Sequence, residues 1–283
     1  MSVAGKQVLI TGATSGIGLA AAKELAARGA RLAIVARDEA KARTAVATID
    51  AGRRARGSVD VLIADLASQG AIRHLASEAL ERYPRVDVLI NNAGVGHAAS
   101  MLTEDGVERM WAVNHLAPFL LTTLVIERLI ESAPARIITT ASNAYKGVRI
   151  PFDDLDGGRP HRAWGTRRYQ QTKLANILFT AELSRRLDGT GVTANCFHPG
   201  GVKSGLQRES GTLDRIVLFM HKPLLRSAEE AAETLVWLAD AAEIAGESGG
   251  YFVDRQRVVP DPEARDPQSA TRLWEVSAAQ VGV

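Results

Sequence analysis

The amino-acid sequence predicts an α/β fold: a doubly wound, mainly parallel sheet of seven strands with helices on both faces. Short β-branched runs alternate with longer helical patterns along the whole chain, an order typical of parallel sheets with crossover helices. Most of these runs are apolar throughout, as strands buried on both faces are. The 283 residues lie within the range that one α/β domain fills, so we expect a single domain over 1–283.

Seven apolar runs are predicted to form the strands. They are QVLIT at 7–11, RLAIVA at 31–36, SVDVLIA at 58–64, VDVLI at 86–90, ARIITTA at 135–141, VTANCF at 192–197 and GGYFV at 249–253. Helical stretches separate them. IGLAAAKELAARG is expected to stop at Gly29, and SAEEAAETLVWLAD has Ser227 as an N-cap.

Two segments depart from this alternation. Residues 146–164 are rich in Gly, Pro and Asp and predict a loop inserted between the fifth strand and the next helix. Residues 201–226 mix polar residues with an apolar run at 213–225 and are interpreted as a substrate lid. The apolar run itself fits a lipophilic lid and a core helix equally well.

Composition excludes several classes of protein. The 34 basic and 32 acidic residues are spread along the chain, so nucleic acid is not expected as a partner, and the cluster of Arg53, Arg54 and Arg56 is interpreted as a solvated loop. The single Cys196 suits a reducing compartment. No apolar run before the first strand is long enough for a signal peptide or membrane span, and the histidines show no metal-ligand spacing. We therefore expect a cytoplasmic protein without a metal site.

The segment TGATSGIG follows the first predicted strand and precedes a helix. Gly12 permits a tight turn, Gly16 lets the backbone approach a pyrophosphate, and Gly18 allows close packing of the helix on the sheet. The N-terminus of that helix offers free N–H groups to phosphate. In this context the glycines predict dinucleotide binding, and the fold is expected to be of the Rossmann type.

Further motifs make the chain resemble the short-chain dehydrogenases/reductases. Besides the TGxxxGxG spacing, it carries NNAG at 91–94, YQQTK at 169–173 and HPGGV at 198–202 in the family's order. Longer segments are similar to the retinol dehydrogenase-like branch of that family: VNHLAPFLLT at 113–122, SAPARI at 132–137, KLANILFTAEL at 173–183, GTGVTANCFHPG at 189–200 and TRLWEVS at 271–277.

The resemblance implies a set of cofactor contacts. Asp65 and Leu66 match the positions that bracket the adenine, and HPGGV matches the segment whose backbone contacts the nicotinamide amide. The full set expected to bind the cofactor is Gly12, Thr14, Ser15, Gly16, Ile17, Gly18, Arg37, Asp65, Leu66, Asn92, Ala93, Gly94, Tyr169, Lys173, Pro199, Gly200 and Val202.

The end of the second strand favours NADP(H) over NAD(H). By similarity, NAD-dependent relatives carry an acid at the strand's tip, where this chain has Ala36. Arg37 follows and can form a bidentate pair with a 2′-phosphate. Asp38 lies about 20 residues beyond the glycine turn, where an NAD-type acid is expected, but it also makes a good N-cap for the next helix.

Four residues are the catalytic candidates: Asn114, Ser142, Tyr169 and Lys173. Tyr169 and Lys173 are four apart and share one face of a helix, a spacing that alone is common on solvated helices. Hydride transfer to a carbonyl leaves an alkoxide that needs a proton, and we expect Lys173 to lower the Tyr169 pKa by roughly 1 to 3 units. By resemblance Lys173 also binds the nicotinamide ribose, Ser142 polarises the carbonyl, and Asn114 holds a water of the proton relay.

The sequence thus predicts an NADP(H)-dependent oxidoreductase that interconverts an aldehyde or ketone and an alcohol, with a lipophilic substrate. A non-catalytic NADP(H)-sensing Rossmann protein is the alternative; an epimerase or dehydratase is disfavoured because such relatives have a wider glycine spacing and a larger C-terminal domain. The resemblance is compatible with a homo-oligomer, although the sequence shows no interface motif. Arg167 and Arg168 before Tyr169 have no assigned role.

Overall fold

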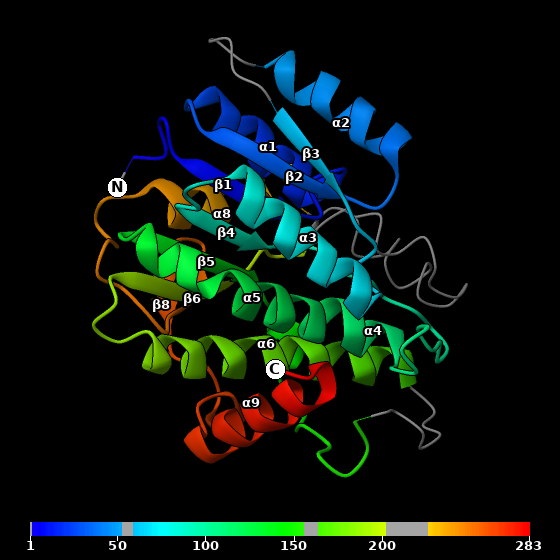
Figure 1. Cartoon of the computed structure of the whole chain (residues 1–283). Coiled ribbons are helices and arrows are strands. Elements are labelled where there is room, and N and C mark those ends of the chain that lie inside the picture. The colour runs from blue at the N-terminus through cyan, green and yellow to red at the C-terminus, as the bar shows by residue number, and fades with distance from the viewer. Residues whose placement is uncertain (1, 53–58, 156–163, 202–225) are drawn as a thin grey trace.

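One eight-stranded sheet runs through the protein. The computed structural model describes residues 2–52, 59–155, 164–201 and 226–283. Strands pair in the order β3-β2-β1-β4-β5-β6-β7-β8, with all neighbours parallel except β7 and β8 (Figure 1). The strands are β1 Gln7–Thr11, β2 Arg31–Ala36, β3 Val59–Ile63, β4 Val88–Asn91, β5 Ala135–Thr140, β6 Val192–His198, β7 Tyr251–Val253 and β8 Gln256–Val258.

The α/β class and the seven predicted strands are confirmed, but the expected strand number is too low by one. β8 is three exposed residues that pair antiparallel with β7. The hairpin turns at Asp254 and Arg255, which both have positive φ. Such turns favour Asn-Gly or Asp-Gly; Asp254 fits this pattern, but Arg255 stands where glycine is usual, so the sequence signal for a hairpin is weak.

Helices cover both faces of the sheet and enclose two separate cores. On one face, α1 Gly16–Ala27, α2 Glu39–Asp50 and α8 Ala228–Asp240 pack over apolar residues of the strands. On the other, α3 Gln69–Arg82, α5 Ala117–Glu131, α6 Trp164–Arg186 and α9 Pro267–Val281 enclose the second core. Shorter elements are α4 Arg109–Trp111, the π-helix η1 Ala112–Leu116, and the 3-10 turns η2 Asn143–Tyr145 and η5 Pro262–Ala264.

Side-chain caps fix where the helices begin. Ser227 and Glu230 form a reciprocal capping box at the start of α8, as the sequence predicts for Ser227. Asp38 caps α2 by accepting the N–H of Lys41 at 2.8 Å. Helix α1 ends at Ala27, two residues before Gly29, whose φ is +87°. These local signals place the helix starts at the sheet edge that carries the predicted site.

Parts of the predicted insertion and lid lie outside the described residues. Residues 146–155 of the expected inserted loop form turns and irregular backbone, and α6 begins at Trp164. Segments 53–58, 156–163 and 202–225 are not described, so the Arg53 cluster, Val202, most of the expected lid at 201–226 and the apolar run 213–225 stay predictions.

One helical segment of the described residues, Arg109–Glu131, is long and apolar enough to cross a membrane, with a hydropathy of 1.3. Of that window, 67% is buried inside the structure, where α5 packs against α3 and the sheet. A buried core helix has the same length and composition, so the segment is weak evidence for a membrane span.

Candidate active site

The carboxyl ends of the parallel strands form one edge of the sheet, along which most predicted site residues lie. β1 and β4 are neighbours, with β2 beyond β1 and β5 beyond β4. Such a reversal of strand order opens a crevice beyond the strand ends, where open α/β sheets bind ligands. The glycine turn after β1, the NNAG segment after β4 and Ser142 after β5 therefore share one edge.

The turn between β1 and α1 requires its glycines. Gly12 and Gly16 have φ values of +69° and +53°, in the left-handed region that side chains disfavour. A Cβ on Gly18 would lie 2.1 Å from the carbonyl oxygen of Gly12 and 2.5 Å from Asn92 Nδ2. Gly18 is therefore needed for close packing against the turn itself and Asn92.

The same turn leaves room for a phosphate group. A Cβ on Gly16 would meet nothing within 4 Å in the described part of the chain. Ser15 stands at the N-cap of α1 but makes no side-chain cap there, so the first N–H groups of the helix face this space without that partner. Thr14 and Ile17 flank them and are half-buried. This cradle fits the pyrophosphate of a dinucleotide.

Asn92 connects the ends of three strands. Its Nδ2 donates to the carbonyl oxygens of Thr11 and Gly12, both at 3.3 Å, and its Oδ1 accepts from Thr140 Oγ1 at 3.2 Å. The Thr11 hydroxyl in turn accepts the N–H groups of Asn92 and Ala93 at 3.0 and 3.1 Å. β1, β4 and β5 are thereby fixed relative to one another at the edge of the site.

Asn114 and Lys173 both approach Gly94 closely. A Cβ on Gly94 would lie 3.4 Å from Asn114 Oδ1 and 3.8 Å from Lys173 Nζ. Asn114 Oδ1 accepts the Val95 N–H at 2.7 Å, and Asn114 Nδ2 donates to the Val95 carbonyl oxygen at 2.9 Å. The same Nδ2 also donates to Thr172 Oγ1 at 3.2 Å. Asn114 is fully buried within the π-helix, so its side chain holds the NNAG segment against α6.

Tyr169 and Lys173 lie together on α6. The Lys173 Nζ lies 5.4 Å from the centroid of the Tyr169 ring and donates to the carbonyl oxygen of Thr140 at 3.1 Å. Burial raises the pKa of Tyr169 to about 12 and lowers the pKa of Lys173 to about 8. The expected lowering of the Tyr169 pKa is therefore wrong for this structure, because burial acts against the phenolate.

Ser142 follows β5 and caps the short turn η2. Its Oγ accepts the N–H of Ala144 at 3.1 Å. Because this bond uses Oγ as an acceptor, the hydroxyl proton is available for donation to another group. The side chain is half-buried, at the sheet edge next to the carbonyl of Thr140 that Lys173 contacts.

The end of β2 separates the roles of Arg37 and Asp38. Arg37 is exposed, and no hydrogen bond or ion pair joins it to another described residue. Asp38 is committed to the N-cap of α2, and the N–H of Lys41 lowers the pKa of its carboxyl group. At this strand end, the guanidinium of Arg37 is therefore exposed and makes no ion pair with a described residue.

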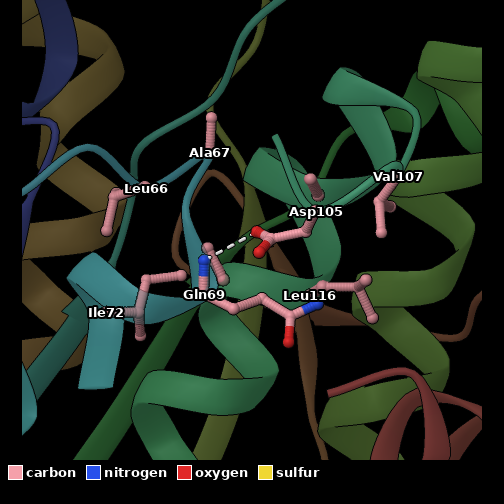
Figure 2. Close-up of a pocket in the computed structure, with 9 residues that line it drawn as sticks. Leu66, Ala67, Gln69, Ile72, Asp105, Val107 and Leu116 are labelled. Carbon is pink, nitrogen blue, oxygen red and sulfur yellow. Dashed lines mark hydrogen bonds between the residues drawn. The ribbon is translucent and has the colours of Figure 1, made fainter. Parts of the chain in front are cut away.

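Two neighbouring pockets lie beside the strand ends. One is lined by Thr11, Leu66, Asn91, Ala93, Val113, Ala117, Pro118 and Leu121. The other lies beyond Leu66, at the start of α3, where the Gln69 N–H donates to Asp105 at 2.9 Å (Figure 2). None of the four catalytic candidates lines either pocket. Leu66 lines both pockets, whereas Asp65 lines neither and accepts the Ala67 N–H at 3.0 Å; their expected contact with the adenine stays a prediction.

The HPGG segment leaves β6 at the opposite end of the site. Gly200 has a φ of +86°, and a Cβ there would lie 2.9 Å from Arg226 Cδ. The Arg226 N–H donates to the carbonyl oxygen of Gly201 at 2.7 Å, and its guanidinium pairs with Asp254 in the β7–β8 turn. Pro199 is half-buried beside them, and Val202 lies outside the described residues.

Arg168, which the sequence left unassigned, is a buried ion-pair partner. Its Nε donates to Glu108 Oε2 at 2.9 Å, with 2% and 0% of the two side chains exposed. Its guanidinium lies 4.9 Å from the ring centroid of Trp111 and bonds the carbonyl oxygen of Leu155. Glu108 also accepts the N–H groups that start α4. The pair joins the helix of Tyr169 to the segment that leads to Asn114.

Three other polar residues at the site were missed by the sequence. Thr11 and Thr140 organise the strand ends, and Asn176 donates to the carbonyl oxygen of Thr140 at 3.2 Å. Asn176 follows Lys173 by three residues on α6, so helical spacing alone could have placed both on one face. Nothing comparable marks the two threonines. Thr11 bonds backbone N–H groups, and Thr140 offers its own backbone carbonyl, and contacts with the backbone leave no signature in the sequence.

Comparison with known proteins agrees with this architecture. The family model of the short chain dehydrogenases matches residues 6–152. Human retinol dehydrogenase 13 is 42% identical over 297 aligned positions, covering 100% of this chain and 86% of that protein. A protein of Streptomyces sp. (strain C5) named as a proposed daunorubicin C-13 ketoreductase, DnrU, is 43% identical over 278 positions, covering 98% and 93%.

Solved structures of short-chain dehydrogenases share this fold. A short chain dehydrogenase from Burkholderia cenocepacia J2315, in complex with NADP, has a TM-score of 0.71 and 29% identity, covering 89% of this chain and 97% of its own.

A doubly wound sheet with a glycine turn at its switch point defines a dinucleotide-binding protein. The chain belongs to the short-chain dehydrogenase/reductase family, in its retinol dehydrogenase-like branch. Membership supports an oxidoreductase acting on CH–OH donors and their carbonyl counterparts, with a nicotinamide nucleotide as cofactor. The role of each site residue stays a prediction.

Replacing Gly18 with Ala tests the packing of the glycine turn. The added methyl group would collide with the Gly12 carbonyl, so we expect the free energy of unfolding to fall by about 1–3 kcal/mol, as overpacking does. Urea denaturation measures this. Gly70→Ala is the matched control, because a Cβ there meets only Ser68 Oγ at 3.8 Å; equal effects of the two changes would contradict the packing explanation.

Replacing Arg168 with Met tests the buried ion pair. The change leaves the carboxylate of Glu108 buried without its cation, so we expect the free energy of unfolding to fall by about 3–5 kcal/mol. Arg167→Met at the exposed neighbouring position should change it by less than about 0.5 kcal/mol. A loss for Arg168→Met no larger than for Arg167→Met, in denaturant titrations, would show that the pair is energetically neutral.

Proposed function

We propose that the protein is an NADP(H)-dependent carbonyl reductase, with Tyr169 as the proton donor to the substrate oxygen. The observation that carries this proposal is the placement of Lys173: its Nζ lies over the Tyr169 ring and bonds the carbonyl of Thr140. That carbonyl ends β5, two residues before Ser142. This arrangement supports a site in which a tyrosine, a lysine and a serine hydroxyl act together beside the end of β5.

The bound nicotinamide would supply the hydride to the carbonyl carbon of the substrate. The Ser142 hydroxyl would donate a hydrogen bond to the carbonyl oxygen, where negative charge develops. With its pKa raised to about 12, Tyr169 stays protonated near neutral pH, and an alkoxide is basic enough to take its proton. The raised pKa therefore supports reduction as the working direction.

The chain's own residues fit a nicotinamide nucleotide. The Gly12 to Gly18 turn leaves room for the pyrophosphate at the N-terminus of α1. Lys173 has two N–H donors beyond its bond to Thr140, and these would bind the nicotinamide ribose. Asn114 would hold the NNAG segment in place through Val95, and its proposed part in the proton relay rests on the resemblance.

The preference for NADP(H) is supported by the end of β2. Arg37 is exposed at that strand end, while Asp38 is occupied as the N-cap of α2. A free guanidinium suits a 2′-phosphate better than a carboxylate does. Proteins with NADP in their structures occur among the neighbours of this fold.

We further propose a lipophilic ketone or aldehyde as the substrate. The names of two relatives refer to retinol and to a ketone of daunorubicin, and retinol is largely hydrocarbon. The apolar segment expected to cover such a substrate, 213–225, lies outside the described residues.

Removal of the Tyr169 hydroxyl should abolish turnover but not cofactor binding. We expect Tyr169→Phe to lower kcat by at least about 100-fold, since it removes the proton donor. NADPH consumption with long-chain aldehydes, retinal, steroid ketones and polyketide-like ketones would measure this, beside fluorescence titration of NADPH. A native protein that binds NADPH tightly but consumes it with none of these carbonyls would favour a sensing role.

A charge reversal at Arg37 should change the cofactor preference. We expect Arg37→Asp to weaken NADPH binding at least about tenfold and to leave NADH binding nearly unchanged, because only NADPH carries the 2′-phosphate. Arg43→Asp is the matched control, since Arg43 is exposed on α2 and pairs only with Glu39 in the described structure, at 3.3 Å. If Arg37→Asp left the ratio of the two affinities unchanged, the NADP assignment would be wrong.

A further inference from the structure

The carbonyl oxygen of Thr140 accepts two side-chain hydrogen bonds from α6. Lys173 Nζ donates at 3.1 Å and Asn176 Nδ2 at 3.2 Å. A carbonyl oxygen has two lone pairs, so both bonds can form at once, and together they complete its acceptor capacity. Thr140 is buried. Asn176 therefore fixes the acceptor on which the buried ammonium of Lys173 depends.

The carbonyl end of the Asn176 amide makes no such bond. Asn176 Oδ1 and His115 Nδ1 are buried atoms, and neither makes a hydrogen bond within 3.5 Å in the described part of the chain. His115 nevertheless lies against α6, with its ring centroid 6.3 Å from that of Phe179. Burial lowers the pKa of His115 to about 3, so its ring is neutral near pH 7 and has one donor and one acceptor nitrogen.

The other side of His115 contacts the C-terminal helix. Its Nε2 forms a hydrogen bond with the Ser277 hydroxyl of α9, at 2.8 Å. One turn earlier in the same segment, Trp111 Nε1 donates to Gln280 of α9 at 3.0 Å. The His115 ring also packs on Trp111, with centroids 4.6 Å apart. Ser277 and Gln280 of α9 thus bond the residues that follow and precede Asn114 in this segment, His115 and Trp111.

We propose that Asn176 is a positioning residue for Lys173, because both side chains donate to the carbonyl oxygen of Thr140. The path runs from the Asn176 amide to that carbonyl and from the carbonyl to the lysine. It rests on the proposed function only in taking Lys173 as a cofactor-binding residue. Because Asn176 and Thr140 are buried and uncharged, they act on the lysine by geometry and carry no charge of their own.

A double-mutant cycle between Asn176 and Lys173 tests the proposal. Asn176→Leu keeps the side-chain volume but removes the bond to Thr140. We expect it to weaken NADPH binding by about tenfold in the native background, because the carbonyl that bonds the ammonium loses one of the two hydrogen bonds that hold it. In a Lys173→Met background the same change should have almost no further effect, because the ammonium it positions is gone.

Thr180→Val is the matched control. Thr180 is buried on α6 one turn beyond Asn176 and donates to the Asn176 backbone carbonyl, so its replacement is also isosteric and also removes a buried bond. We expect it to lower the melting temperature without changing NADPH affinity more than about twofold.

Fluorescence titration of NADPH reads out each variant without turnover. A native affinity in Asn176→Leu, or an equal loss of affinity in both Lys173 backgrounds, would overturn the proposal. An equal loss in Thr180→Val would do so too, since it would show a general effect of loosening α6. If the native protein binds NADPH but reduces no carbonyl, the proposed function fails while this cycle still gives its answer.

Discussion

The amide group of Asn92 is the contact on which the rest of the site depends. It donates to the Thr11 and Gly12 carbonyls and accepts from the Thr140 hydroxyl, so a single side chain joins the ends of β1, β4 and β5. In a parallel sheet these ends carry unpaired backbone groups that need partners when buried. By satisfying them, Asn92 fixes the distance between the glycine turn and the strand that leads to Ser142.

Thr140 extends this link from the cofactor side of the site to the catalytic side. Its hydroxyl bonds Asn92, and its carbonyl bonds Lys173 and Asn176. A displacement of β5 would therefore move the lysine relative to the glycine turn. Gly18 reinforces the same arrangement, because only a residue without a Cβ can approach Asn92 and the Gly12 carbonyl so closely. The fold and the site are thus stabilised by the same few contacts.

The sequence predicted the parts of this structure that local patterns determine. Apolar runs located β1 to β7 because strands buried on both faces need them, and cap residues such as Ser227 and Asp38 start their helices as expected. It missed β8, whose turn has Arg255 where glycine is usual after Asp254. It also gave the wrong direction for the Tyr169 pKa, because burial depends on contacts between distant segments, and it left Arg168 without its buried partner Glu108.

The two pKa shifts explain why the position of Lys173 matters so much. Burial disfavours the charged form of both side chains, so it raises the Tyr169 pKa to about 12 and lowers the Lys173 pKa to about 8. The ammonium keeps its proton near neutral pH by a narrow margin, and the Thr140 carbonyl is the dipole that bonds it. Any motion that lengthens this bond lowers the Lys173 pKa further and weakens the positive charge beside Tyr169. A site that needs that charge therefore requires a rigid acceptor, which a carbonyl at the end of a buried strand provides.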